Sequence, residues 1–130
     1  MYVSDTHALV YHTLNRSARL GRKANQIFVR AESLQAVVVI PSMVLWEVVL
    51  LMELGRLSLD QSFEHWCRRL QNHRGFDIVP LDWLDVNEAR SISLIDPYDR
   101  LIVGTATRLD MPLITCDQQI VDSGLVETIW

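Results

Sequence analysis

Two aspartates stand directly after short apolar segments that have the composition of buried strands. Asp5 follows residues 1–4, and Asp117 follows the sequence Leu-Ile-Thr-Cys. A single aspartate in such a position is most often part of a turn or a helix cap. Sites in parallel sheets form beyond the carboxyl ends of the strands, so two aspartates placed this way are expected to converge in space.

A third acid, Glu47, lies in the very apolar segment formed by residues 36–54. A buried ionised carboxylate is costly unless it is paired or binds a metal. The alternative is that Glu47 shares one exposed stripe of a helix with Glu53. At 3.6 residues per turn these two positions are roughly 120° apart, so a narrow stripe does not easily hold both. A functional role for Glu47 is therefore favoured.

The fourth candidate comes from the sequence Asp-Pro-Tyr-Asp-Arg at residues 96–100. Asp96 has the features of a helix N-cap, Pro97 those of a first helical residue, and Asp99 would occupy the third helical position. Both acids suit the positive end of a helix dipole. Helix initiation accounts fully for Asp96, whereas Asp99 would also join a site if the start of this helix faces the other acids.

Asp5, Glu47, Asp99 and Asp117 together form a candidate cluster of carboxylates. Like charges packed together repel and raise pKa values unless a cation neutralises them. No histidine or cysteine joins the four acids at a zinc-like spacing, and ligands that are all oxygen favour Mg²⁺ or Mn²⁺. Such a site can orient and deprotonate a water for in-line attack on a phosphodiester and stabilise the leaving oxygen.

The elements that must position these acids alternate along the chain. We expect strands at residues 1–4, 36–40, 76–79, 112–115 and 126–130. Helices are expected at residues 6–14, 17–32, 42–54 and 58–74, from Asp82 or Asp85 to residue 95, and at 97–108. This alternation predicts a parallel sheet of about five strands covered by helices on both faces, within a single domain of residues 1–130.

Local signals suggest how two of these helices begin and end. Ser42 can cap the apolar helix that follows it, and Gly55 can end that helix. Ser58, with Gln61 three residues later, has the pattern of a capping box and predicts the start of the next helix.

Composition restricts the class of protein. The chain is 49% hydrophobic and 22% charged, which is ordinary for a soluble globular domain. No uncharged run reaches the roughly 18 residues of a membrane helix, and the start of the chain lacks the features of a signal peptide. Two cysteines without a Cys-x-x-Cys pair fit a reducing cytoplasm.

The cations are almost all arginine. The net charge is −4, which by itself argues weakly against nucleic-acid binding, but eleven of the twelve basic residues are arginines, which suit phosphate contacts. Two clusters are visible and are interpreted here as solvated helix faces: Arg16, Arg19, Arg22 and Lys23, and Arg68, Arg69 and Arg74.

Four motifs in this order resemble the PIN-domain fold, and closely the VapC-type ribonuclease toxins of bacterial toxin–antitoxin pairs. The motifs are VSDTHALVYH, IPSMVLWEVVLL, DPYDRLIVGTA and PLITCDQQI, and they span nearly the whole chain. Each motif alone is a weak signal, whereas four in the right order within 130 residues are quite specific.

The resemblance implies a three-layer α/β/α sandwich with a central parallel sheet and Mg²⁺-dependent cleavage of RNA that leaves 5′-phosphate and 3′-hydroxyl ends. It also implies a homodimer and a neutralising antitoxin partner. Asp5, Glu47, Asp99 and Asp117 match the four acids of the family, whereas Asp96 is not an expected ligand.

Three smaller positions also follow from the resemblance. Thr6 and Thr115 match hydroxyl positions that can hydrogen-bond a metal-bound water or a carboxylate. Gly104 stands where the helix of the family usually carries alanine, and it is expected to loosen this helix without affecting the site.

Other functions are weighed against individual residues. A phosphatase with an aspartyl nucleophile needs Asp-x-Asp after the first strand, but this chain has Asp5, Thr6 and His7. A phosphoacceptor receiver domain needs a lysine at a late strand end, and the only lysine is Lys23. An inactive PIN-like interaction module is disfavoured because all four acids are present.

The remaining aromatic and apolar residues suggest packing and interfaces. His12, His65 and His73 are interpreted as packing or surface residues, and the four tryptophans as core or interface residues rather than base-stacking platforms. We expect either residues 43–54 or residues 59–70 to cover a dimer or antitoxin interface, because both helices carry more apolar surface than one face needs.

Overall fold

A parallel sheet of five strands forms the centre of the computed structural model, which describes residues 1–14 and 16–130. The strands are β1 (Tyr2–Ser4), β2 (Val38–Pro41), β3 (Phe76–Val79), β4 (Leu113–Ile114) and β5 (Thr128–Ile129). Their order is β3-β2-β1-β4-β5, and every neighbouring pair is parallel. The prediction of a parallel sheet with about five strands is confirmed.

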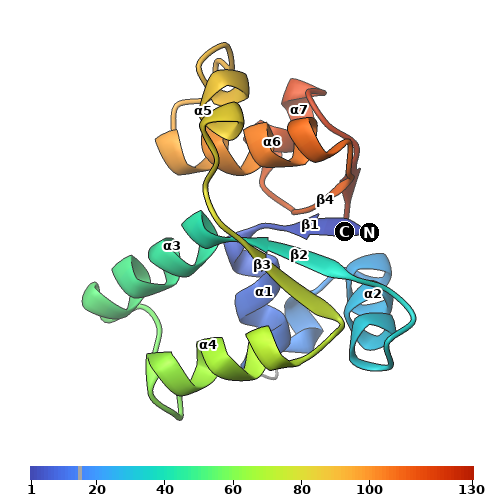
Figure 1. Cartoon of the computed structure of the whole chain (residues 1–130), viewed down its shortest axis with the longest axis vertical. Coiled ribbons are helices and arrows are strands. Elements are labelled where there is room, and N and C mark those ends of the chain that lie inside the picture. Colours follow the sequence, from blue (N-terminus) through green and yellow to red (C-terminus); the bar gives the residue numbers. More distant parts are fainter. Residues whose placement is uncertain (15) are drawn as a thin grey trace.

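Helices cover both faces of this sheet (Figure 1). Their bounds are α1 (Thr6–Thr13), α2 (Arg22–Glu32), α3 (Ser42–Glu53), α4 (Phe63–Asn72), α5 (Trp83–Ala89), α6 (Pro97–Leu109) and α7 (Gln118–Ser123), with a 3₁₀ turn at Ser17–Arg19. Figure 1 shows α1, α2 and α4 on one face and α5, α6 and α7 on the other. Helix α3 contacts both α1 and α6. The chain thus forms the predicted α/β/α sandwich.

The core lies between the sheet and these two helix layers. All four residues of β2 are buried, as expected for a β-branched strand covered on both faces. The fully buried side chains include those of Phe28, Leu9, Ile40, Ile102 and Leu113. The continuous apolar run before α3 is therefore explained by burial of β2 on both faces.

The sheet contains one switch point, at which the side of β1 to which new strands are added reverses. From β1 the chain adds β2 and then β3 on one side, after which it crosses over and adds β4 and β5 on the other side of β1. In open parallel sheets a ligand crevice forms beyond the carboxyl ends of the two strands at such a switch point. Here those strands are β1 and β4, which are followed by Asp5 and by Thr115 to Asp117.

Several predicted helix ends were wrong. The segment 17–32 is not one helix, because α2 begins only at Arg22 with Gly21 as its N-cap. The helix predicted from residue 58 begins at Phe63, where Ser62 rather than Ser58 supplies the capping oxygen. The helix expected to reach residue 95 ends at Ala89.

Residue Ser42 was also assigned the wrong role. Pro41 is the N-cap of α3, and the Ser42 hydroxyl instead accepts a hydrogen bond from the Leu81 amide at 3.1 Å. This contact ties the start of α3 to the segment between β3 and α5. Gly55 does follow the end of α3, with a φ of 68° that suits glycine.

Helices α5 and α6 pack unusually closely at Gly104. A Cβ at this position would lie 2.7 Å from the Asp85 carbonyl oxygen and 3.1 Å from the Ala89 nitrogen. Gly104 therefore permits the close approach of α5, and it was wrong to expect that it only loosens α6. The same contact is held by a hydrogen-bonded ion pair between Arg108 and the fully buried Asp85.

No helix in the described part of the chain has the length and apolar character to cross a membrane.

Candidate active site

The first two acids lie on either side of the switch point of the sheet. The amide of Asp5 donates to the Ile114 carbonyl, which places Asp5 beside the end of β4. The Asp5 carboxylate accepts a hydrogen bond from the Ala8 amide at 2.7 Å and caps α1. Asp117 caps α7 in the same way through the Gln119 amide at 2.8 Å. Both acids are thus helix caps, and they also converge as predicted.

Thr115 links these two acids. Its hydroxyl oxygen accepts a hydrogen bond from the Asp117 amide at 3.0 Å. A hydrogen bond of the Thr115 side chain to Asp5 works to lower the pKa of that carboxyl. Burial is the larger effect, however, and it raises the pKa of Asp5 above its usual range. Thr115 therefore interacts with both acids, with the backbone of Asp117 and with the buried carboxylate of Asp5.

Glu47 faces the start of α1 from the second turn of α3. Thr6 donates its hydroxyl proton to Glu47 Oε1 at 2.6 Å, across 41 positions of sequence. Partial burial raises the pKa of Glu47, and the negative charges of Asp96 and Asp5 add to this effect. Glu53, in contrast, is exposed. The two acids of α3 therefore have different surroundings, as their angular separation indicated.

Asp99 lies in the first turn of α6, and its pKa is raised well above the usual range of an aspartate. Its pKa is raised to about 7, first by burial and then by the charges of Asp96, Asp117, Glu47 and Asp5. Asp96 caps α6 by accepting hydrogen bonds from the Tyr98 amide at 2.7 Å and the Asp99 amide at 3.2 Å. The start of α6 therefore both begins the helix and brings Asp99 to the other three acids.

The donor atoms of this cluster fit a hard divalent cation. All four side chains offer carboxylate oxygens. Burial is the largest cause of the raised pKa of Asp99 and neighbouring negative charges add to it, and a bound cation would offset both effects. Among the described residues, no three acidic, histidine or cysteine side chains already converge closely enough to hold an ion. Each of Asp5, Glu47 and Asp99 has its pKa raised in part by the charge of another of these acids, so the four carboxylates lie near enough for their charges to interact.

One histidine lies at the edge of the acid cluster. His7 is exposed in the first turn of α1, and its positive charge lowers the pKa of both Asp5 and Glu47. The effect of His7 is small beside that of burial for both acids. The only signal in the sequence that His7 lies beside the acids was its position two residues after Asp5.

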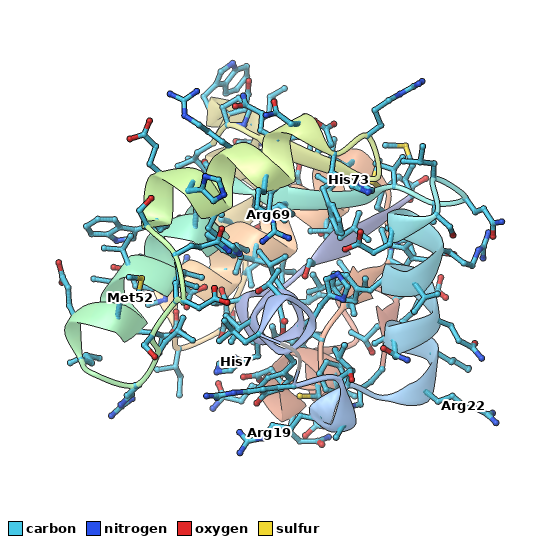
Figure 2. All side chains as sticks on the ribbon, turned by 90° about the horizontal axis from the view of Figure 1, so that it is seen from below. His7, Arg19, Arg22, Met52, Arg69 and His73 are labelled. Atoms are coloured by element: carbon cyan, nitrogen blue, oxygen red, sulfur yellow. The ribbon has the colours of Figure 1, made fainter. Side chains whose placement is uncertain are left out.

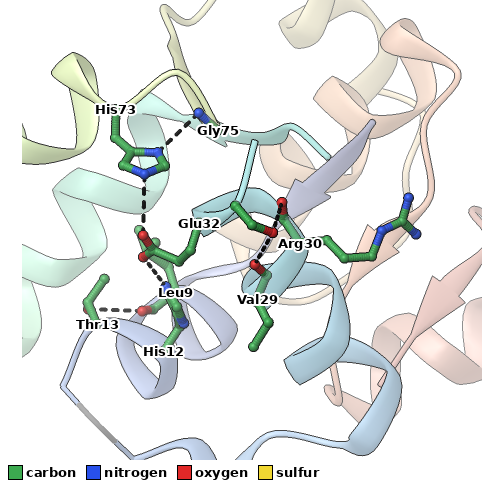
Figure 3. Close-up of polar contacts among 9 residues, drawn as sticks. Leu9, His12, Thr13, Val29, Arg30, Glu32, His73 and Gly75 are labelled. Carbon is green, nitrogen blue, oxygen red and sulfur yellow. Dashed lines mark hydrogen bonds and ion pairs between the residues drawn. The ribbon is translucent and has the colours of Figure 1, made fainter. Parts of the chain in front are cut away.

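Two other histidines form a separate cluster with Glu32 (Figure 3). His12 Nε2 lies 2.9 Å from Glu32 Oε1, and His73 Nε2 lies 3.4 Å from Glu32 Oε2. His73 Nδ1 accepts a hydrogen bond from the Gly75 amide, so its proton must reside on Nε2. These contacts join α1, α2 and the start of β3, and they support the packing role predicted for His12 and His73.

Two charges that matter here were not predicted from the sequence. Asp96 was assigned only to helix initiation, yet its charge is the second largest cause of the raised pKa of Asp99. Asp85 was considered only as a possible helix start, whereas it is fully buried and paired with Arg108. The spacing of Asp96 and Asp99 could have indicated the first, but nothing in the sequence indicated the second.

Comparison with known proteins identifies the family. The model of the PIN domain family matches residues 2–123, which is most of the chain. Among curated protein sequences, none matches the chain at a significant level.

Solved structures agree in fold despite low sequence identity. A toxin–antitoxin complex from Klebsiella pneumoniae has a chain with a TM-score of 0.66 at 16% identity, covering 100% of this chain and 97% of that one. VapBC2 from Rickettsia felis, bound to a DNA fragment from its promoter, gives 0.69 at 14% identity, with 98% and 96% covered. FitAcB from Neisseria gonorrhoeae gives 0.60 at 19% identity, with 100% and 97% covered. With its acids gathered at the switch point of a parallel sheet, the chain belongs to the PIN domain family.

Proposed function

We propose that this chain is an endoribonuclease that depends on Mg²⁺ and acts as the VapC-type toxin of a type II toxin–antitoxin pair in the cytoplasm. The observation that carries this proposal is the convergence of Asp5, Glu47, Asp99 and Asp117, with the pKa of Asp99 raised to about 7. Burial and mutual repulsion make such a cluster of acids costly for the fold, and a bound cation would offset this cost. Perturbed acids of this kind are typical of functional sites. Residues 1–130 are proposed to act as one domain.

The four carboxylates are the residues that would hold Mg²⁺, or Mn²⁺ in its place. When bound, the ion supplies charge neutralisation and a more acidic water. Asp5 and Asp117 define two sides of the site from the ends of β1 and β4, and Asp99 approaches from α6. Thr6 and Thr115 act as supporting residues, because their hydroxyls orient Glu47 and Asp5. Together these side chains direct a water toward phosphorus and accept its proton, leaving a 5′-phosphate and a 3′-hydroxyl.

Substitution of single acids tests this function. We expect Asp5→Asn and Asp99→Asn to abolish cleavage of RNA and growth arrest, because either change removes a charged ligand. Asparagine has nearly the same shape as aspartate, and at position 5 it keeps an oxygen that can cap α1, so the fold should be retained. Asp77→Asn, at an exposed acid of the edge strand β3, is the matched control and should retain activity. The measurement is cleavage of labelled RNA with Mg²⁺ and with EDTA, alongside circular dichroism to confirm the fold.

Two outcomes would overturn the proposal. Full activity of either asparagine variant would show that the acids are not required, and activity unaffected by EDTA would remove the role of the ion. If the unmodified chain cleaves no RNA but still binds a protein partner, it is an inactive interaction module instead.

Partners are proposed on two grounds. The similar solved chains come from toxin–antitoxin complexes, which supports a cognate antitoxin for this chain. A homodimer is supported by exposed apolar side chains on α5 and its flanking segments, where Trp83 is 73% and Ile95 is 87% exposed. Such side chains are costly to leave in water and favour burial against a second protein surface. The helices expected to form an interface, α3 and α4, expose fewer of them, chiefly Trp46 and Leu54.

A further inference from the structure

An RNA substrate meets an electrostatic obstacle at this site. The net charge of the chain is −4, and four carboxylates gather where the scissile phosphate must lie. Even with a divalent ion bound, phosphates on either side of the scissile bond require cations of the protein. The structure should therefore contain a cationic surface that begins at the rim of the acid cluster.

The strip begins at His7, whose exposed side chain lies in the first turn of α1, two residues after Asp5, which caps this helix. One turn further along α1, the Tyr11 ring lies 6.0 Å from the His7 ring, measured between centroids. The Arg19 guanidinium carbon then lies 5.8 Å from the centre of the Tyr11 ring. An aromatic and cationic surface thus leads away from the acids along the outer side of α1.

Trp130 extends this surface across the sheet edge. It follows β5, and the hydrogen bond from the Thr115 amide to the Ile129 carbonyl places it one strand beyond Thr115. Its ring meets the Tyr11 ring edge to face at 6.2 Å. Beyond it, Trp130 lines a cavity of about 410 Å³ together with Arg22 and Lys23 of α2, with Glu127 as its one acidic wall.

The cations of this surface are free to bind a ligand. In the part of the chain that the structure describes, Arg19, Arg22 and Lys23 form no ion pair with any acid. Arg22 and Lys23 also lie in the first turn of α2, where the positive end of the helix dipole disfavours cations. Their position therefore does not serve the stability of α2, although it would serve an anionic ligand.

The second arginine cluster (Arg68, Arg69 and Arg74) differs from the first in the ion pair that Arg68 forms and in its position on the molecule. Arg68 is paired with Glu64 on the same helix at 2.8 Å. Figure 2 shows His7 and Arg19 on one side of α1 and Arg69 and His73 on the opposite side. Arg74 lines a hollow with Met1 and Leu34, at the amino end of the sheet and away from the acids. Only the first cluster is continuous with the candidate active site.

We infer that single-stranded RNA lies along the surface formed by His7, Tyr11, Arg19, Trp130, Arg22 and Lys23, here called the α1–α2 strip. Arg19, Arg22 and Lys23 contact successive phosphates, while the rings of Tyr11 and Trp130 offer faces and edges against which bases stack. Both rings are partly buried and pack against the core, in keeping with the core or interface role predicted for Trp130. For the cations, the sequence had favoured a solvated helix face. This inference rests on the proposed ribonuclease function, because it concerns the substrate of that same site.

Binding measurements without catalysis test the strip. Fluorescein-labelled single-stranded RNA is titrated with the Asp99→Asn protein in EDTA at several salt concentrations, and anisotropy gives the Kd. Replacing Arg19, Arg22 and Lys23 with alanine should weaken binding and reduce the slope of log K against log salt by about 2, at about 0.7 per lost phosphate contact. Tyr11→Leu should weaken binding about tenfold through lost stacking, with little change in the slope.

A matched control removes three other exposed cations: Arg30, Arg56 and Arg74, each changed to alanine. This control lowers the net charge equally but leaves the strip intact, so its salt slope should stay close to that of the parent. The same two triple variants made with Asp99 present should differ in KM far more than in kcat.

The outcomes separate this inference from the proposed function. If the strip and control variants bind RNA equally, the strip is not the RNA surface, even though metal-dependent cleavage by the unmodified chain would leave the ribonuclease proposal standing. If the strip variant binds RNA normally but is no longer neutralised by an antitoxin, the surface serves a protein partner and the inference is overturned. If the unmodified chain cleaves no RNA, the proposed function fails. If in that case the strip variant loses RNA binding and the control variant does not, the strip is a surface that binds RNA without cleavage.

Discussion

Single residues in this candidate site have a structural role beside the chemical role proposed for them. Asp5 and Asp117 are helix caps, as a cautious reading of each alone suggests, and they also meet at the switch point of the sheet. The sequence therefore predicted both acids for the right reason, namely their position after a strand. The sequence could not predict that the charge of Asp96 raises the pKa of Glu47, because this effect depends on how the first turn of α6 is oriented toward α3.

The acidity of Asp99 gives a prediction at this scale. Its pKa rises from 3.8 to about 7 on folding, so between these values the folded protein holds a proton that the unfolded chain has lost. The contribution of Asp99 to stability without metal is then fully present below about pH 4 and is lost as the pH rises toward and through 7. Asp99→Asn removes this ionisation and should flatten the decline.

Thermal unfolding in EDTA between pH 4.5 and 8 checks this expectation. The melting temperature of the unmodified protein should fall relative to that of Asp99→Asn as the pH increases. Asp77→Asn, at an exposed acid, serves as the control and should follow the unmodified protein. Parallel curves for all three proteins would contradict the raised pKa of Asp99.

At the scale of elements, the contact between α5 and α6 determines where Asp99 lies. Arg100, the residue after Asp99, donates to the Ala89 carbonyl at 3.1 and 3.2 Å through two nitrogens and so ties the start of α6 to the end of α5. The buried pair of Asp85 and Arg108 holds the other end of this contact. Helix α6 is thus fixed against α5 at both of its ends.

Substitution at Gly104 tests this close packing. In an isolated helix Gly104→Ala would stabilise by roughly 1 kcal/mol. Here the added Cβ would lie 2.7 Å from the backbone oxygen of Asp85, which cannot move away without shifting α5. We expect a net loss of about 1–3 kcal/mol in the free energy of unfolding, as for other overpacked sites.

The matched control for this change is Thr107→Ala, at an exposed position of the same helix. It gains helix propensity without a clash and should be neutral or slightly stabilising. Chemical denaturation of both variants gives the two free energies, and a more stable Gly104→Ala protein would show that α5 yields easily.

The elements themselves were largely predictable, whereas their ends were not. All five strands and the alternation with helices as far as β4 follow from apolar runs and turn residues, because burial on both faces leaves a clear signal in composition. Helix α7, between β4 and β5, was not predicted. Ser58 failed as a cap because Ser62, four residues later, offers the same hydroxyl and precedes the better buried Trp66 and Leu70. Gly21 interrupts residues 17–32, since α2 begins where Trp130 packs against that glycine. Both outcomes depend on tertiary contacts that no local pattern contains.

At the scale of the whole molecule, the exposed apolar side chains of α5 lead to a prediction about assembly. Trp83 is 73% exposed, and Leu84 and Val86 are also exposed on the same short helix. If two copies bury these side chains against each other, Trp83→Arg should shift the protein from dimer to monomer while preserving the fold. Analytical ultracentrifugation measures this shift. Val29→Arg, at an exposed position of α2, should leave the dimer intact, and an unchanged mass for Trp83→Arg would place the interface elsewhere.

The position of β1 in the sheet also sets when the acid cluster can assemble during synthesis. β1 is the central strand, yet its partners β2 and β4 begin 36 and 111 positions after Tyr2. Contacts between such distant segments form late, because the intervening chain must first be made and ordered. Asp5 acquires Asp99 and Asp117 as neighbours only after the 112 positions from Asp5 to Asp117 have been synthesised. A nascent chain that stops before residue 117 therefore lacks one of the four acids, and the proposed cleavage activity would appear only once this acid has been added.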